Sequence, residues 1–231
     1  MQKHMRNVVL IVAAVIIAGV SVWGPLAFAD PKKVKPKALV PQTGQTTCVS
    51  PVPIPGGIDC TGTGQDGDIQ TGVALPTPRF KDNADGTITD NLTGLRWLKD
   101  VGCIGNPTWL AGFSRVTELN SGTNLFCTDY VPGTFSDWRI SNINELHSLI
   151  NYGFFLPAIS NAQGNAKWSA GDPFVNLPVI IQSGAGFILS STPVSQLDPN
   201  TGSIWAMQPA FGVIFINGPD GGFFWPVRGP E

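Results

Sequence analysis

Short apolar stretches, each ended by a turn signal, make up most of the chain after residue 79. Between Arg79 and Leu98 the apolar positions are separated by Asp85-Gly86 and Thr93-Gly94, two tight-turn signals, and this pattern predicts a three-stranded meander. Four further apolar segments predict closing strands over 187–192, 203–207, 212–216 and 223–228. Helical periodicity is found in only two segments between these groups.

The central strand, over 135–140, alternates bulky apolar and charged positions. Trp138 alternates with Asp137 and Arg139, which would therefore point to the opposite side of a pleated strand. The favoured interpretation of Asp137 and Arg139 is a structural ion pair. Four tryptophans on predicted strands are expected in the core: Trp97, Trp138, Trp205 and Trp225.

A short helix is predicted directly after this strand, over 142–150. Asn142 precedes Glu145 by three residues, the spacing at which cap and third-residue side chains satisfy each other's backbone N–H groups. Apolar residues then recur at helical spacing, so one face is buried. Asp137, Asn142 and Glu145 could alternatively supply oxygen ligands to calcium, although capping already accounts for two of them.

The other helix is predicted from Asn106-Pro107 to about Asn120, with proline at the first helical position and Ser121-Gly122 as its end. Its expected inner stripe consists of Trp109, Phe113, Val116 and Leu119.

The N-terminus has the pattern of an export signal. A basic start, an apolar run over 8–23 and Ala27-x-Ala29 predict a signal peptide over 1–29, cleaved after Ala29. An uncleaved membrane anchor is the alternative, but the apolar run is shorter than a spanning helix needs. Residues 30–41 then form a Lys- and Pro-rich linker, 42–78 an irregular arm, and 79–231 the main domain.

Four cysteines lie after the signal peptide, an even number that predicts two disulfides in an exported protein. Of three pairings, Cys48–Cys60 with Cys103–Cys127 is preferred because each closes a local loop. Zinc is the alternative, but no C-x-x-C spacing occurs and only one histidine, His147, follows the signal. The expected location is periplasmic, cell-surface or extracellular.

The charge balance disfavours two classes of partner. From residue 42 onward the chain carries eight basic and fifteen acidic side chains, a formal charge of −7. A surface of that sign repels nucleic acid and anionic membranes. No nucleic-acid partner is expected, and no membrane insertion after signal cleavage.

A long segment rich in Gly, Pro, Asn and Ala, over 152–186, is predicted to form loops, which in compact domains of this kind are often functional. Within it, Trp168 is a candidate for stacking on a sugar ring, and Asp172 and Asn176 are candidates for binding sugar hydroxyls. The alternative for Asp172 and Asn176 is that they are solvated loop residues, as residues of these types usually are.

Catalytic and cofactor motifs are not found in the sequence. His147 lies in a predicted helix with no nucleophile motif near it, and no phosphate loop, dinucleotide fingerprint or haem motif occurs. An EF-hand alignment on Gly86 places Lys81 and Leu92 at ligand positions, so a polar hairpin tip is favoured over calcium. A glycosidase-type carboxylate pair would escape detection in a sequence. We expect a non-enzyme without metal or cofactor.

Several motifs in fixed order resemble the Lcl C-terminal domain family of secreted bacterial proteins, named for a collagen-like adhesin. They are Pro78-Arg79-Phe80, the segment Asp85 to Leu98, Asp137-Trp138-Arg139 with Asn142-x-x-Glu145-Leu146, Ser190-Ser191-Thr192, Trp205 and Val227-Arg228-Gly229. The resemblance covers roughly 43–229. It implies a C-type-lectin-like α+β fold: a curved antiparallel sheet, two helices and long loops.

The resemblance also implies a secreted or envelope-associated binding role, and for the namesake adhesin the binding of sulfated glycans. Here basic residues are sparse and scattered, whereas a polyanion site needs them clustered. The expected function is therefore non-enzymatic adhesion or binding of carbohydrate or an envelope component through the 153–187 loops. The alternative is a structural or assembly subunit, for which a homo-oligomer is a natural form.

Overall fold

The computed structural model describes residues 40–50, 52, 57–177, 184–194 and 202–230. These residues belong to one compact unit, Ala38–Glu231. The predicted signal peptide and nearly all of the predicted linker lie outside the described residues. Within the part of the chain that is described, no helix is both long and apolar enough to span a membrane.

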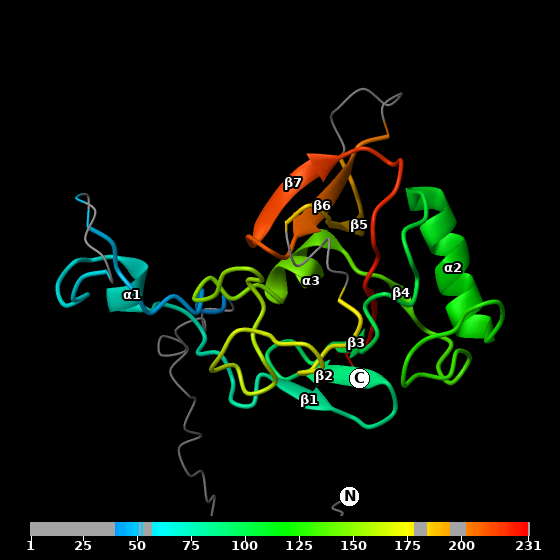
Figure 1. Ribbon diagram of the computed structural model, residues 1–231, viewed down its shortest axis with the longest axis horizontal. Coiled ribbons are helices and arrows are strands. Elements are labelled where there is room, and N and C mark those ends of the chain that lie inside the picture. Colours follow the sequence, from blue (N-terminus) through cyan, green and yellow to red (C-terminus); the bar gives the residue numbers. More distant parts are fainter. Residues whose placement is uncertain (1–39, 51, 53–56, 178–183, 195–201, 231) are drawn as a thin grey trace, which may run out of the picture. The chain divides into compact units, whose positions relative to one another are not determined.

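The first sheet has five strands in the order β1-β2-β3-β8-β4, all antiparallel. Figure 1 labels its strands β1 to β4. Its strands are β1 Phe80–Asp82, β2 Thr87–Asp90, β3 Arg96–Leu98, β4 Arg139–Ile140 and β8 Pro226–Arg228. The predicted meander is confirmed as β1 to β3, with Ile88 opposite Trp97 in the register. Both predicted turns form, and Gly86 and Gly94 have positive φ angles of 79° and 74° that glycine adopts without strain.

The second sheet has three antiparallel strands, β5 Ile188–Pro193, β6 Ile204–Gln208 and β7 Val213–Asn217. The last predicted strand, 223–228, does not join it throughout. Phe223 makes a single bridge to Ile188, whereas β8 pairs with β3 and β4 in the first sheet. The α+β class is confirmed. The single curved sheet is corrected to two sheets, because the 223–228 segment passes from one to the other.

The longer helix, α2 Trp109–Ser121, begins later than predicted. Thr108 is its N-cap and accepts from the Ala111 N–H, so Pro107 precedes the cap instead of occupying the first helical position. The predicted end is confirmed, with Gly122 in the left-handed conformation. The buried positions are Gly112, Val116 and Leu119, spaced four and three residues apart.

Phe113, predicted to face inward from α2, is instead 41% exposed. The residue at the inner position beside it is Gly112, which the Phe224 ring approaches so closely that a Cβ there would lie 2.5 Å from Cζ. The aromatic ring that fills this space therefore comes from the segment before β8, and not from the helix.

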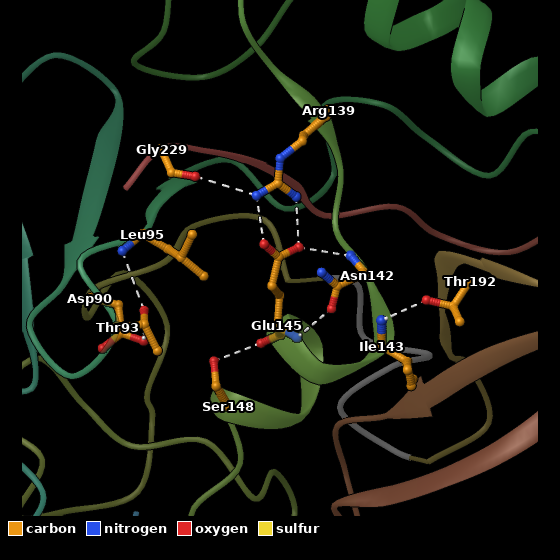
Figure 2. Close-up of polar contacts among 10 residues, drawn as sticks. All are labelled: Asp90, Thr93, Leu95, Arg139, Asn142, Ile143, Glu145, Ser148, Thr192 and Gly229. Atoms are coloured by element: carbon orange, nitrogen blue, oxygen red, sulfur yellow. Dashed lines mark hydrogen bonds and ion pairs between the residues drawn. The ribbon is translucent and has the colours of Figure 1, made fainter. Parts of the chain in front are cut away.

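The shorter helix, α3 Ile143–Ser148, has the capping box that the sequence predicted (Figure 2). The Asn142 side chain accepts from the Glu145 N–H at 3.0 Å, and the Glu145 carboxylate accepts from the Asn142 N–H at 2.8 Å. The Ile143 N–H donates to Thr192 of β5, and α3 packs against β5 and β6. A third, four-residue helix, α1 Asp66–Ile69, lies in the arm and was not predicted.

Two buried clusters form the core. One contains Trp97 and Trp225, whose rings meet edge to face, and the other contains Trp138, which donates its indole N–H to the Tyr130 hydroxyl at 2.7 Å. These three tryptophans confirm the core prediction, while Trp205 on β6 is half-buried.

Candidate functional site

Trp168 does not offer a surface for a sugar ring. It is only 6% exposed and belongs to the same core cluster as Trp97 and Trp225. Its backbone N–H donates to Ile159 and its indole N–H to the Phe174 carbonyl at 3.2 Å. The loop folds back on itself and buries the ring, because an apolar side chain of this size gains more in the core than in water. The prediction of an exposed stacking residue is therefore corrected.

The other two loop candidates hold the backbone or a neighbouring loop. Asp172 accepts from the Ala162 N–H at 3.0 Å, and Asn176 donates to the Thr128 hydroxyl at 2.7 Å. Neither lines the two cavities described below. Both are ordinary hydrogen bonds between loop segments. The structure does not bring Trp168, Asp172 and Asn176 together as one site.

Asp137 and Arg139 both form ion pairs, but not with each other. Arg228 donates to the Asp137 carboxylate at 2.7 Å, and this hydrogen bond holds the pKa of Asp137 below its ordinary value. Arg139 binds the Glu145 carboxylate, which raises the pKa of Arg139 (Figure 2). The same Glu145 carboxylate closes the capping box. Among the described residues, no group of three or more His, Cys, Asp or Glu is placed to hold a metal.

Both preferred disulfides form, Cys48–Cys60 and Cys103–Cys127. The first closes a loop within the arm. The second joins the turn before α2 to the segment after it. The predicted pairing is confirmed, and each bond limits the freedom of a segment that has little regular structure of its own.

A cavity of about 290 Å³ lies between the arm and the first part of the predicted loop region. We call it the polar compartment. Its lining includes the amide side chains of Gln42, Gln45, Gln70, Asn151 and Asn165, together with Phe154. None of the described residues that line it is charged. Amide groups can both donate and accept hydrogen bonds, so this lining suits a ligand with many uncharged polar groups.

The arm is held against the loop by close backbone contact. The Tyr152 N–H donates to the Thr43 carbonyl at 2.8 Å, and the Gln45 amide donates to the Tyr152 carbonyl at 3.3 Å. A Cβ on Gly44 would lie 2.1 Å from the Asn151 amide oxygen, and one on Gly153 would lie 2.3 Å from the Gly44 carbonyl. Glycine is therefore needed on both sides of this contact.

Other hydrogen bonds fix the far side of the arm. Val73 donates to the Val40 carbonyl and accepts from the Gln42 N–H, each at 2.9 Å, and the Thr43 hydroxyl contacts Asp66 at the start of α1. Val40, assigned to the linker from its sequence, thus pairs within the arm. The arm is irregular, yet its backbone is well connected.

Two amide groups of the polar compartment keep a donor available for a ligand. Asn151 is 4% exposed, and its oxygen accepts from the Gly153 N–H at 2.9 Å. The Asn165 oxygen accepts from the Asn161 amide at 3.0 Å. Within the described residues, the side-chain nitrogen atoms of Asn151 and Asn165 donate no hydrogen bond. Both nitrogen atoms are therefore free to donate to water or to a ligand that enters the compartment.

A second cavity, of about 590 Å³, lies beside the first. We call it the apolar compartment. Its apolar lining consists of Val40, Pro41, Leu75, Leu92, Ile150 and the ring of Tyr152. His147, at the end of α3, lies at 2.9 Å from the Tyr152 hydroxyl and also lines it. Gln42, Thr43 and Leu75 line both compartments.

The sequence prediction of a functional loop region includes Gly153, Phe154, Gly164 and Asn165, which do line the polar compartment. It missed the arm, which supplies the opposite side. The signal that could have pointed there is the run of amide and glycine residues over 42–45, which has no apolar periodicity to mark it as core.

Comparison with known proteins agrees with the motifs. The Lcl C-terminal domain matches residues 86–228, which include every strand of the second sheet, both longer helices and the 151–165 side of the polar compartment. No curated protein matches the chain. Because the match covers more than half of the sequence, the chain belongs to the Lcl C-terminal domain family.

Proposed function

We propose that this protein is a non-enzymatic binding domain that recognises an uncharged carbohydrate, or an envelope component bearing one, in the polar compartment. The observation that carries the proposal is the uncharged, amide-rich lining, with two amide donors that no described residue uses. Sugar hydroxyls can accept from these donors, and the Phe154 ring supplies an aromatic face for the apolar side of a pyranose.

The chemistry of the lining also favours binding over catalysis. Amide side chains do not exchange protons near neutral pH, so the polar compartment offers no general acid or base among the described residues that line it. A sulfated ligand is equally disfavoured, because no Lys or Arg is among those residues.

We also propose that the protein works outside the cytoplasm, at the cell surface, in the periplasm or in the medium. The two disulfides support this location, since such bonds persist in oxidising compartments. With the acidic balance of the main domain, a glycan or envelope partner fits better than a nucleic acid.

A glycan array followed by calorimetry tests the binding proposal. Asn165→Asp removes the amide donor while keeping the shape and the oxygen that Asn161 contacts. Affinity for the best uncharged glycan should fall roughly two- to tenfold, the value of one neutral hydrogen bond. Asn106→Asp, an exposed site outside both compartments, adds the same charge and should bind as wild type does.

The arm offers a second pair of variants. Gly44→Ala drives a Cβ into Asn151 and should abolish binding, whereas Gly64→Ala has a similar positive φ, 70° against 82°, with nothing within 4 Å, and should keep it. Equal affinity for wild type, Asn165→Asp and Gly44→Ala would contradict the proposed site. Recognition of sulfated glycans alone would contradict the ligand class.

A second candidate function is an assembly subunit, favoured by the edge strand β7. Val213 and Ile216 on it are 45% and 43% exposed, and the exposed Phe155 and Phe211 rings lie beside each other at 5.3 Å. An apolar edge strand is a ready site for pairing with another chain. If light scattering gives oligomers that Val213→Lys dissociates, and the array gives no glycan, this second function is the better one.

A further inference from the structure

The two compartments differ in chemistry but share a boundary. Five amide side chains line the polar compartment, whereas aliphatic and aromatic groups dominate the apolar one. Leu75 and the arm residues Gln42 and Thr43 line both. A single ligand that lies along the arm can therefore contact both linings.

Residues 150–154, which lie opposite the arm, line both compartments. Ile150 and Tyr152 line the apolar compartment, whereas Asn151, Gly153 and Phe154 line the polar one. This segment turns at Tyr152 and Gly153, where the Phe154 N–H donates to the Asn151 carbonyl at 3.1 Å, and one short segment thus forms part of both linings. The backbone bond from Tyr152 to Thr43 lies where they meet.

Size and solvent exposure support a hydrocarbon occupant for the apolar compartment. Its volume of about 590 Å³ is in the range of small-molecule sites. Val40 is exposed, and Leu75 and Leu92 are half-buried, so these side chains have apolar surface left to bury. Each methylene removed from water there would raise the affinity by up to about fourfold.

The head group is constrained by charge. None of the described residues lining the polar compartment is basic, and Asp66 contacts the Thr43 hydroxyl at its edge. A phosphate or sulfate head would find no cation and a nearby carboxylate. An uncharged head with several hydroxyls fits the amides.

We propose that the ligand is an amphiphilic glycoside, with an uncharged sugar in the polar compartment and a hydrocarbon chain in the apolar compartment. This inference rests on the proposed function and specifies its ligand class. It predicts a protein that recognises glycolipids by both ends at once.

The test measures the affinity of the full-length mature protein for alkyl β-glycosides of glucose, galactose and N-acetylglucosamine, each with methyl, butyl, hexyl and octyl chains below their micelle concentrations. For the recognised sugar, affinity should rise about two- to fourfold per methylene, as expected for burial of a hydrocarbon chain. Octyl sulfate should bind at least tenfold more weakly than the octyl glycoside.

Variants separate the two ends of the ligand. Leu92→Asn and Val40→Asn each place a polar group in the apolar compartment and should flatten the dependence on chain length while the methyl glycoside keeps its affinity. Val40 is 72% exposed, so its substitution should not disturb folding. Leu110→Asn, at an exposed site on α2, is the matched control and should bind every member as wild type does.

Each outcome has a distinct meaning. Binding of a methyl glycoside with no gain from methyl to octyl overturns the amphiphile and leaves the proposed function intact. Equal binding of octyl glycosides and octyl sulfate overturns the sugar head, and with it the proposed function. No binding of any member overturns both.

Discussion

The buried ion pair between Arg79 and Asp90 gives the sharpest test of how this fold is stabilised. Their side chains are 2% and 0% exposed, and Arg79 binds the carboxylate with two nitrogen atoms, at 3.0 and 2.9 Å. The same guanidinium donates to the Ser148 carbonyl at 2.8 Å, at the end of α3. Asp90 also accepts from the Leu92 N–H and the Thr93 hydroxyl. This pair joins the meander to α3.

Replacing Arg79 with methionine keeps much of the side-chain volume but leaves the Asp90 carboxylate buried without its cation. Breaking one partner of a buried pair costs about 3–5 kcal/mol. For a domain of this size, that loss lowers the melting temperature by roughly 6–20 °C. It is a large fraction of the about 5–15 kcal/mol that stabilises a typical domain.

Equilibrium denaturation in guanidinium chloride, with the disulfides intact, measures the change. Arg115→Met is the matched control: Arg115 pairs with Glu118 on α2, both side chains are partly exposed, and its loss should cost at most about 1 kcal/mol. The double variant Arg79→Met with Asp90→Asn removes the unpaired charge and should regain part of the stability. Equal losses for Arg79→Met and Arg115→Met, or a double variant less stable than the single one, would refute this reasoning.

Two further predictions concern packing and pH. Gly112→Ala should destabilise the protein by about 1–2 kcal/mol, because the added Cβ would lie 2.5 Å from the buried Phe224 ring, and this clash outweighs the higher helix propensity of alanine. If the same denaturation assay finds the variant more stable than wild type, this prediction is wrong. For Asp137, whose pKa the Arg228 hydrogen bond lowers from 3.8, the unfolded chain binds the proton more readily. The stability advantage of wild type over Asp137→Asn should be constant above about pH 5 and shrink below about pH 4. An advantage that grows in acid would disprove the assigned partner.

Features set by neighbouring residues were predictable from the sequence. The capping box depends only on Asn142 and Glu145, three positions apart, and the meander depends on turn glycines such as Gly86. The disulfides are also local, with sequence separations of 12 and 24. In each case the information lies within a short segment, so a pattern of residue types suffices.

Features set by distant contacts were not predictable. Trp168 lies in a polar, glycine-containing loop that gives no periodic signal for burial, and it belongs to a core cluster with Trp97 and Trp225, which are far away in sequence. The same holds for β8, whose partners β3 and β4 are far away in sequence and whose apolar pattern fits either sheet. Residue type alone could not decide between these arrangements.

The polar compartment is the strongest example of a feature set by distant contacts. It also limits what membership of the family says about the ligand. The Gln45–Tyr152 hydrogen bond joins residues 107 positions apart, and the family match begins only at residue 86. The domain shared with the family thus supplies one side of the polar compartment, and the arm outside the match supplies Gln42, Gln45 and Gln70 on the other. The charge and the hydrogen-bond donors of the compartment therefore depend on the arm as well as on the family domain. The ligand class of the namesake adhesin, sulfated glycans, therefore cannot be transferred to the polar compartment. Three of the five amide side chains that line this compartment come from a segment that the family match does not include.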